Sequence, residues 1–238
     1  MLNTKRNAQT EQATVFTGNR YVMEHDHLQV IRLDRRLAGR AAEVMLCAYK
    51  RDPMMEYVLP DAERKTSRTI WFIETGLRYG LRYGDVYTTP DVSGVAVWLP
   101  PDHPEMTLPG LLRTGLLFAP FRLGRKPFGR LLNCVEYTHH IHHELLPGPH
   151  WYLYELAVEP SRQSMGIGAA LLKPVLDKAD ETRLSCYLET FAERAVSFYE
   201  RLGFTVECEG APPKGGPVCW AMVRKPGGEK QGANVSTP

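Results

Sequence analysis

The sequence predicts an α/β protein (α+β mixed sheet) whose single domain has a central mixed, mostly antiparallel sheet flanked by helices. Short runs of β-branched, aromatic and aliphatic residues alternate with longer runs whose apolar residues recur every three or four positions. The 238 residues are enough to bury one substantial core. We assign residues 26–226 to this domain, and the polar, aperiodic residues 1–25 and 227–238 to flexible tails.

The N-terminal part of the domain alternates between strand and helix patterns. The expected elements are a strand at 29–33, helices at about 37–49 and 62–84, and strands at 86–89 and 94–99. The first helix is expected to stop before Asp52-Pro53, because a proline disfavours helical geometry in the residue before it. A turn beginning at Pro90 predicts that the strands at 86–89 and 94–99 form an antiparallel pair.

The middle of the chain shows interrupted helical periodicity, and a clearer pattern follows it. Pro109, Pro120 and Pro127 break the helical stretch at 105–146. Beyond it we expect a strand at 151–158, a helix at about 166–179, a strand at 184–190, a short helix at 195–202 and a closing hairpin with strands 204–208 and 218–223. Pro174 is expected to kink the helix that contains it.

Composition and charge exclude several classes of partner. A formal net charge of +2 creates no field suited to nucleic acid or an anionic membrane, and no apolar run approaches the ~20 residues that cross a bilayer. The polar N-terminal residues contain no apolar signal segment, so a cytoplasmic protein is expected. The five cysteines are scattered without a Cys-x-x-Cys pair, which argues against a disulfide framework or a zinc site.

Five histidines cluster before and after Pro147. Helical spacing would place three of them on one side, where a metal site is conceivable. No cysteine or paired acidic residue supports a metal, so a solvated helix end is the preferred interpretation and no metal is predicted. The five are His139, His140, His142, His143 and His150.

A glycine-bearing loop between the strand 151–158 and the next helix predicts an anion site. Gly166 and Gly168 allow close approach of a ligand to the backbone, and the first turn of a helix leaves its N–H groups unpaired at the positive end of the dipole. A diphosphate suits such a loop. The expected contacts are Gln163, Ser164, Met165, Gly166, Ile167, Gly168 and Ala169.

Two common diphosphate motifs do not fit this loop. A dinucleotide fingerprint requires a third glycine at position 171, which is Leu171, and a P-loop requires Lys after the second glycine, where Ala169 stands. A simple pair of turn glycines is the alternative explanation. The preceding strand, the following helix and Gln163 three residues before Gly166 favour a binding loop.

The Gln-x-x-Gly-x-Gly pattern at 163–168 resembles the coenzyme A signature of the GNAT acetyltransferases, and 188–190 and 198–204 resemble the end of the same fold. In detail the chain is similar to the puromycin N-acetyltransferase branch through Ala96–Trp98, Leu172–Val175 and Trp220–Pro226. Many members carry an asparagine where this sequence has Ala195, so one cofactor contact differs here.

The resemblance implies acetyl-CoA as cosubstrate and no metal. It also implies that the strand ending at Val158 splays from its neighbour, with backbone N–H groups of Leu156, Ala157 and Val158 facing the thioester. Tyr199 occupies the position of the family's general acid. Because a phenol normally titrates near ~10 and a thiol near ~8.5, Tyr199 either has a lowered pKa or mainly hydrogen-bonds the sulfur.

Two glutamates on predicted strands are candidate bases for the acceptor amine. Glu155 is in phase with Leu153 and Ala157 on an otherwise apolar face, and we predict that it is the base, acting through water. Glu189 lies at a strand end and is predicted to contact the substrate amine. An acceptor pocket and ordinary core packing are both open for four aromatic residues, Tyr49, Tyr57, Trp98 and Tyr187.

The sequence therefore predicts an N-acetyltransferase that moves the acetyl group of acetyl-CoA to a primary amine of a small molecule by direct attack in a ternary complex. The expected protein is a monomer or homodimer without nucleic-acid or membrane partners. Three alternatives stay open: a non-catalytic acyl-CoA-binding regulatory module, an acetyltransferase of protein Lys or N-terminal amines, and a protein that only sequesters an antibiotic.

Overall fold

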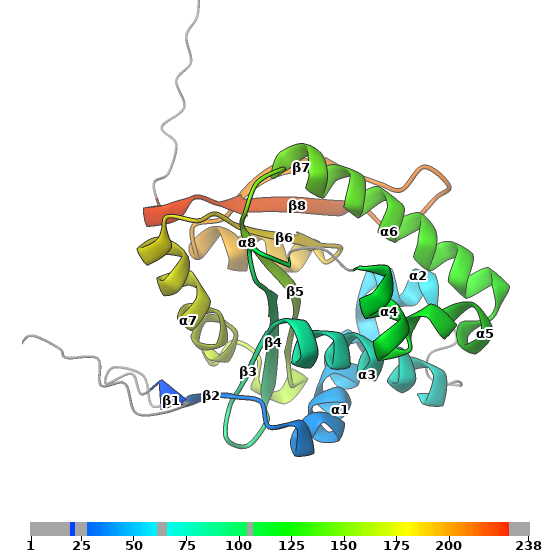
Figure 1. The fold of residues 1–238 in the computed structure, drawn as a ribbon, viewed down its shortest axis with the longest axis horizontal. Helices are drawn as coiled ribbons and strands as arrows, with labels where there is room; N and C mark the ends of the chain where they lie inside the picture. Colours follow the sequence, from blue (N-terminus) through cyan, green and yellow to red (C-terminus); the bar gives the residue numbers. More distant parts are fainter. Residues whose placement is uncertain (1–19, 22–27, 61–65, 104–106, 229–238) are drawn as a thin grey trace, which may run out of the picture.

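A computed structural model describes residues 20–21, 28–60, 66–103 and 107–228, so most of the two predicted tails lies outside the described residues. Its centre is an eight-stranded sheet in the order β1-β2-β3-β4-β5-β6-β8-β7 (Figure 1). Neighbouring strands are antiparallel except β5 and β6, which are parallel. The predicted mixed, mostly antiparallel sheet is confirmed. The strands are β1 (Arg20–Tyr21), β2 (Val30–Arg32), β3 (Asp85–Thr88), β4 (Gly94–Leu99), β5 (Trp151–Val158), β6 (Cys186–Thr190), β7 (Thr205–Gly210) and β8 (Cys219–Arg224).

Helices precede, interrupt and follow the strands along the chain. The α-helices are α1 (Ala38–Ala48), α2 (Pro53–Val58), α3 (Thr66–Tyr83), α4 (Leu108–Thr114), α5 (Ala119–Leu123), α6 (Arg125–Leu145), α7 (Ile167–Thr182) and α8 (Glu193–Arg201). Short 3-10 helices are η1 (Arg35–Leu37), η2 (Tyr49–Arg51), η3 (Leu116–Phe118), η4 (Pro160–Arg162) and η5 (Pro226–Gly228). None of these described helices is both long enough and apolar enough to span a membrane.

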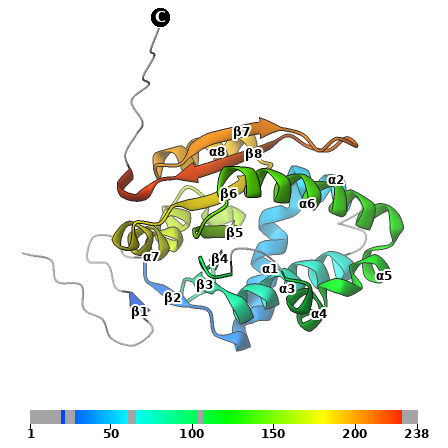
Figure 2. The ribbon, with the colours of Figure 1, turned by 45° about the horizontal axis from the view of Figure 1, so that its top comes forward.

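The helices form a layer on each face of the sheet (Figure 2). On one face, α7 and α8 cover a core in which Leu171 packs with Trp98 of β4. On the other face, α1 and α3 cover a core that includes Met45 and Val97. Trp98 and Val97 are consecutive, and both are fully buried, because successive side chains of a strand point to opposite faces. α6 extends the second layer over β6 and β8 through Ile141.

Two helices differ from the sequence prediction. α2 follows Asp52-Pro53, where only a helix end is expected: the Asp52 carboxylate accepts a hydrogen bond from the N–H of Met55 (3.0 Å) and Pro53 takes the first helical position. α6 runs unbroken for 21 residues through Pro127, because a proline in the first helical turn removes no intrahelical hydrogen bond. The other predicted elements lie within a few residues of the observed ones, and Pro174 lies inside α7.

β5 contains a bulge at Tyr154. Glu155 and Leu153 pair with consecutive residues of β4, so Tyr154 is the extra residue. The bulge reverses the alternation of side chains: Leu153 packs in the core under α7, whereas Ala157 packs in the core under α1 and α3. The expectation that Glu155 is in phase with both Leu153 and Ala157 is therefore wrong, since those two residues lie on opposite faces.

Gly84, between α3 and β3, tests the packing of α3 on the sheet. A Cβ atom at this position would lie 2.2 Å from the carbonyl oxygen of Trp98, so Gly84→Ala forces the backbone to move. We expect the substitution to lower the free energy of unfolding by about 2 kcal/mol, measured by urea denaturation. The control is Gly39→Ala in α1, where an added Cβ has no neighbour within 4 Å and where we expect a gain of ~0.5 kcal/mol. Equal effects of the two substitutions would contradict the described packing.

Candidate functional site

β5 and β6 separate soon after they begin. They pair only through Trp151 with Cys186 and Tyr152 with Tyr187, although β5 continues to Val158. The predicted splay between the strand ending at Val158 and its neighbour is thus present. Beyond Tyr152, one edge of β5 has no strand partner in the described part of the chain, which leaves a gap in the middle of the sheet.

The backbone of β5 beyond the bulge alternates between β4 and this gap. The N–H of Glu159 donates to the carbonyl of Ser93 (2.9 Å), so the backbone of Ala157, two residues earlier, also faces β4. The N–H groups of Leu156 and Val158 consequently face the gap. Of the three backbone donors expected from the sequence, these two are turned toward it and Ala157 is turned away.

The loop between β5 and α7 presents a run of unpaired amides. The N-cap residue Gly166 provides no side-chain cap, and among the described residues no acceptor receives a hydrogen bond from the N–H groups of 166–169. Gln163 ties the loop to the strand, since its Nε2 donates to the carbonyl of Val158 (3.1 Å). Unpaired amides at the positive end of a 16-residue helix attract an anion.

Both glycines of this loop have a geometric reason. Gly166 has φ of +80°, in the left-handed region that side chains disfavour. A Cβ atom on Gly168 would lie 3.1 Å from Cζ of Phe198 in α8. Ser164 also has a positive φ of 64°, and Met165 is 61% exposed. The two glycines therefore belong to a loop whose backbone conformation is fixed by contacts and whose amides stay accessible.

Glu155 lies half-buried between β5, α1 and α3. A Cβ atom on Gly76 of α3 would lie 2.9 Å from its Oε1 atom, and the Tyr49 hydroxyl hydrogen-bonds its carboxylate. Burial raises the pKa of Glu155 to about 7; the bond from Tyr49 lowers this pKa and the charge of Asp52 raises it. A carboxylate with such a pKa accepts and releases a proton near neutral pH.

Asp52, the N-cap of α2, is a site residue that the sequence analysis missed. Its charge raises the pKa of both Glu155 and Tyr199, so its carboxylate lies near both groups. Burial raises the pKa of Asp52 itself, while the N–H of Met55 and the charge of Arg194 lower it. The Asp-Pro pair signals a helix start, but only the fold brings that start next to β5.

Glu189 lies on the other side of the gap, near the end of β6. Burial raises its pKa to about 7, and a hydrogen bond from Tyr152 of β5 partly offsets this. Burial and the charges of Glu155 and Glu189 raise the pKa of Tyr154, so this tyrosine lies near both carboxylates. The structure thus places the two predicted acids on the two sides of the gap, with tyrosines beside them.

Tyr199 of α8 is 8% exposed and packs edge-on against Phe198 and Phe204, with ring centroids 5.1 and 5.9 Å away. Burial, followed by the charge of Asp52, raises the pKa of Tyr199 above its usual value. This direction is opposite to the lowered pKa that the sequence analysis left open for Tyr199. A hydroxyl that keeps its proton and donates a hydrogen bond is the role that the structure favours.

The four aromatic candidates for an acceptor pocket divide between core and site. Trp98 and Tyr187 are fully buried core residues. Tyr49 interacts with Glu155 beside the gap. Tyr57 lines a separate cavity of about 550 Å³ between α2, α6 and the β7–β8 loop.

The histidine cluster is only partly a solvated helix end. Nε2 of His142 lies 2.5 Å from Nε2 of His150, and the His142 ring stacks on Tyr187 at 4.2 Å. The two histidines are 6% and 2% exposed, so the predicted solvation is wrong for them; burial and then His150 lower the pKa of His142 to about 3. No group of three or more His, Cys, Asp or Glu side chains in the described part of the chain is arranged to hold a metal ion. The exposed members are His139, His140 and His143.

Comparison with known sequences identifies similar acetyltransferases. Residues 114–204, which include β5, the loop, α7, β6 and α8, match the model of the acetyltransferase (GNAT) family. An uncharacterized N-acetyltransferase of Schizosaccharomyces pombe is 23% identical over 182 residues, 74% of this chain and 74% of that protein.

Solved acetyltransferase structures share the fold. One from Corynebacterium glutamicum, described as histone acetyltransferase HPA2 and related acetyltransferase, has a TM-score of 0.61 at 23% identity, covering 83% of this chain and 95% of its own. Arylalkylamine N-acetyltransferase 2 of Aedes aegypti has a TM-score of 0.55 at 10% identity, covering 84% and 99%. The predicted acyltransferase fold is confirmed.

The raised pKa of Glu155 predicts a pH-dependent stability. Because this pKa is higher in the folded chain than in the unfolded one, the contribution of Glu155 to stability is present at pH 5 and is lost as pH rises through about 7. The free energy of unfolding, measured by urea denaturation, is compared between Glu155→Gln and the wild type. We expect the difference in favour of the variant to grow by at least ~1 kcal/mol from pH 5 to pH 8. Glu181→Gln, at an exposed position in α7, is the control. A difference in unfolding free energy between Glu155→Gln and wild type that does not change with pH would show that Glu155 is not desolvated.

Proposed function

We infer that this chain is an acetyltransferase of the GNAT type, and we propose that it transfers the acetyl group of acetyl-CoA to a primary amine of a small molecule. The observation that carries the proposal is the run of unpaired amides at 166–169 beside the gap between β5 and β6. The same gap is bordered by two carboxylates and a buried tyrosine. The family match covers all of these elements.

The residues present fit acetyl-CoA. The N–H groups of 166–169 suit the bridging phosphates, and the exposed edge of β5 suits an extended amide-containing arm, which would add beside Leu156 and Val158 like a further strand. Ser164 and Met165 extend the loop alongside it. Ala195 replaces the family's asparagine in the first turn of α8, so the contact to that side chain is lost while the amides of the loop remain.

In the proposed reaction, the amine nitrogen attacks the thioester carbonyl in a ternary complex, and the carbon–sulfur bond breaks without an enzyme-bound acyl group. Before the attack, Glu155, with a pKa of about 7, takes a proton through water from the substrate ammonium and so frees the neutral amine. Glu189 contacts the amine from the opposite side of the gap. Backbone N–H groups of Leu156 and Val158 stabilise the developing oxyanion.

Tyr199 acts at the leaving sulfur in this proposal. Its raised pKa makes complete proton transfer to a thiolate unfavourable, because a thiol is normally the stronger acid. A hydrogen bond from the phenol nevertheless stabilises the charge that develops on sulfur in the transition state. The thiolate then takes its proton from the amine side or from solvent.

The acceptor class follows from the side chains beside the gap and from similar proteins. Asp52, Glu155 and Glu189 form an acidic surrounding that suits an ammonium group, and tyrosines line it. The likeness to arylalkylamine N-acetyltransferase 2 supports a small amine. The likeness to a structure described as a histone acetyltransferase keeps protein lysine as the second candidate.

A thiol-release assay over small amines, lysine peptides and no acceptor tests the proposal. Amine-dependent release of CoA thiol with a small amine is the expected result. Release only with peptides would establish the second candidate, and binding of acetyl-CoA without release for any acceptor would establish a non-catalytic module.

Gly166→Asp is expected to weaken acetyl-CoA binding by about 100-fold or more, measured by isothermal titration calorimetry. Asp tolerates a left-handed conformation and suits a helix N-cap, so the fold persists, but its charge and its bond to the amides compete with the diphosphate. Gly39→Asp places the same charge in the first turn of α1 and should leave binding unchanged. Wild-type affinity in Gly166→Asp would exclude this loop as the diphosphate site.

Glu155→Gln is expected to lower kcat by roughly 100-fold and to abolish the rise of the rate with pH near 7, because the amide cannot accept a proton. Tyr199→Phe should lower kcat less and leave that rise in place. Steady-state rates between pH 5.5 and 9 measure both. If the rise persisted unchanged in Glu155→Gln, the base would be another group.

A further inference from the structure

An open cavity between α2, α6 and the β7–β8 loop is lined, among the described residues, by cations and by no acid. Its charged lining residues come from α6 and from the loop that joins β7 to β8, and its volume is about 550 Å³. The lining residues are Tyr57, Arg125, Lys126, Gly129, Arg130, Asn133 and Lys214. A net charge of +2 for the whole chain makes such a local accumulation notable.

These cations stand where a helix disfavours them. Arg125 and Lys126 occupy the first turn of α6, Arg130 follows one turn after Lys126, and the first turn contains no acidic residue and no side-chain cap. The positive end of the helix dipole repels cations, and like charges four residues apart repel each other. No ion pair joins Lys126, Arg130 or Lys214 to any described residue. A bound anion would relieve all of these repulsions together.

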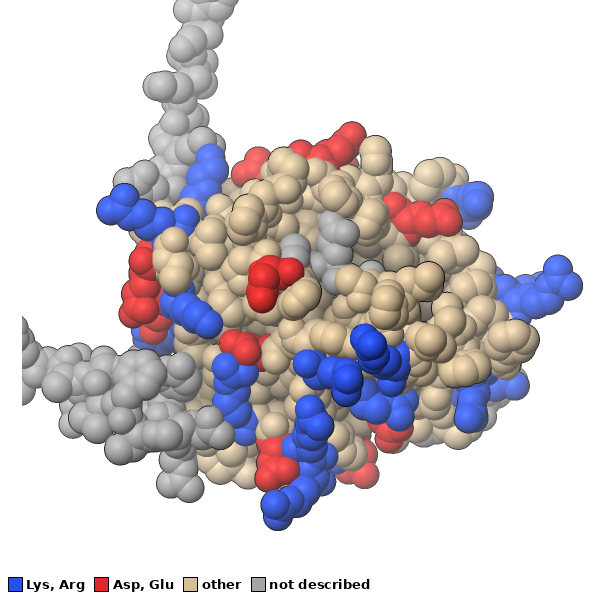
Figure 3. All heavy atoms as spheres, in the orientation of Figure 1, with Lys and Arg blue, Asp and Glu red and all other residues tan. Residues whose placement is uncertain are grey.

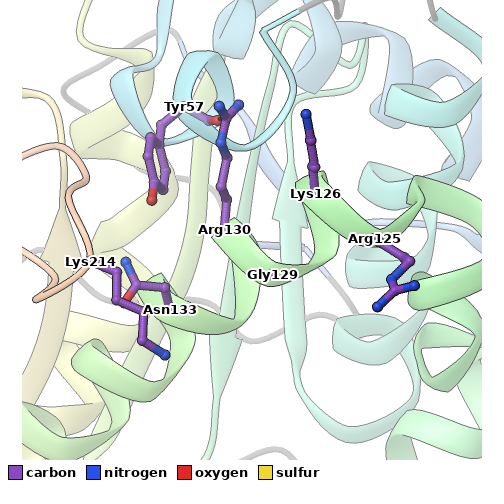
Figure 4. A pocket seen from close by; sticks show the side chains of 7 residues that line it. All are labelled: Tyr57, Arg125, Lys126, Gly129, Arg130, Asn133 and Lys214. Carbon is purple, nitrogen blue, oxygen red and sulfur yellow. Dashed lines mark hydrogen bonds between the residues drawn. The ribbon is translucent and has the colours of Figure 1, made fainter.

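The geometry of the cavity is held by specific contacts. Arg130 donates to the carbonyl of Tyr57 (3.0 Å) and lies 5.3 Å from the centre of its ring, which leaves most of its guanidinium donors for a ligand. Asn133, 5% exposed, donates to the carbonyl of Gly215 (3.2 Å) and so fixes the loop that carries Lys214. Figure 4 shows Lys126 and Arg130 extending from α6 on the side of Tyr57, whereas the amine of Lys214, beside Asn133, and the guanidinium of Arg125 point to the opposite side.

Gly129 of α6 is one of the lining residues of the cavity. It lies in the interior of α6, where glycine weakens a helix, yet no described atom lies within 4 Å of the position that its Cβ would take. Packing therefore gives no reason for a glycine.

In Figure 3, Lys and Arg side chains project at the right-hand edge of the molecule, at the end where α5 meets α6.

α2 extends from the region of Glu155 to this cavity. Asp52 caps this helix near Glu155, and Tyr57, five residues later, lines the cavity, which corresponds to a rise of ~7.5 Å along the helix. The unpaired amides at 166–169 belong to α7, which covers the opposite face of the sheet from α6. The cavity therefore lies on the acceptor side rather than on the diphosphate side.

We propose that this cavity binds the anionic group, a phosphate or a carboxylate, of the acceptor, so that the substrate is an amine with an acidic group on the order of 10 Å away. The acidic groups beside the gap take the ammonium, and Lys126 and Arg130 take the anion. The assignment of this anion to the acceptor rests on the proposed acetyltransferase function, but the anion site itself does not.

Inorganic phosphate is the probe, with acetate and chloride at matched ionic strength as comparison arms. In amide NMR spectra of the whole chain, phosphate should shift the amides of residues 125–133 and 214–216 saturably. Lys126→Gln combined with Arg130→Gln should weaken this binding about five- to tenfold. The control, Arg36→Gln combined with Lys225→Gln, removes two exposed cations on other elements and should not weaken it. Stronger shifts with phosphate than with acetate would identify a phosphate group, and equal ones a carboxylate-sized group.

Shifts that are absent at α6, equal in the double variant and the wild type, or confined to 166–169 would overturn the anion site. In the thiol-release assay, phosphate should then compete with the acceptor and not with acetyl-CoA; competition with acetyl-CoA would overturn the assignment to the acceptor. If no amine supports turnover, the proposed function fails, while the NMR result still decides whether the anion site exists.

Discussion

The early separation of β5 from β6 is the constraint on which the site depends. Two parallel strands that pair through only two residues leave backbone groups of the longer strand exposed in the middle of a sheet, where they would ordinarily be paired. The bulge at Tyr154 sets which backbone groups face the gap and turns Glu155 toward α1 and α3. The loop that follows Val158 then places the unpaired start of α7 beside this same strand. A donor edge, an anion site and a carboxylate thus all follow from one interruption of the sheet.

The charged side chains near this gap are of two kinds, carboxylates beside it and cations farther away, and each kind suits a different group of the proposed acceptor. Burial makes the carboxylates of Glu155 and Glu189 titrate near pH 7, so they are poised to exchange protons in a way that a solvated glutamate is not. Buried Tyr199 holds its proton more tightly than a free phenol, which suits a hydrogen-bond donor. Farther along α2, cations gather at the start of α6 against the field of the helix. Carboxylates close to the reacting groups and cations farther away favour an acceptor that carries both an ammonium and an anionic group.

Much of the fold is predictable from periodicity, and the site only in part. The strand at 151–158, the glycine loop and the closing hairpin are local patterns, and so are the unpaired amides, because every helix start has them. The bulge at Tyr154 is not visible in the sequence, since an extra residue in a strand depends on its partner, and this is why the phase of Glu155 is mispredicted. Asp52 carries a clear helix-start signal, yet its nearness to β5 depends on tertiary packing. The burial of His142 likewise depends on which face of α6 meets β6 and β8.

A crystal structure of the protein with acetyl-CoA tests the central claim most directly, because it compares the gap and the loop with the ligand itself. The account predicts the bridging phosphates within hydrogen-bonding distance of the N–H groups of 166–169, the pantetheine arm along the free edge of β5 at Leu156 and Val158, and the sulfur beside Tyr199. Acetyl-CoA bound at another surface, with β5 and the start of α7 left untouched, would contradict it.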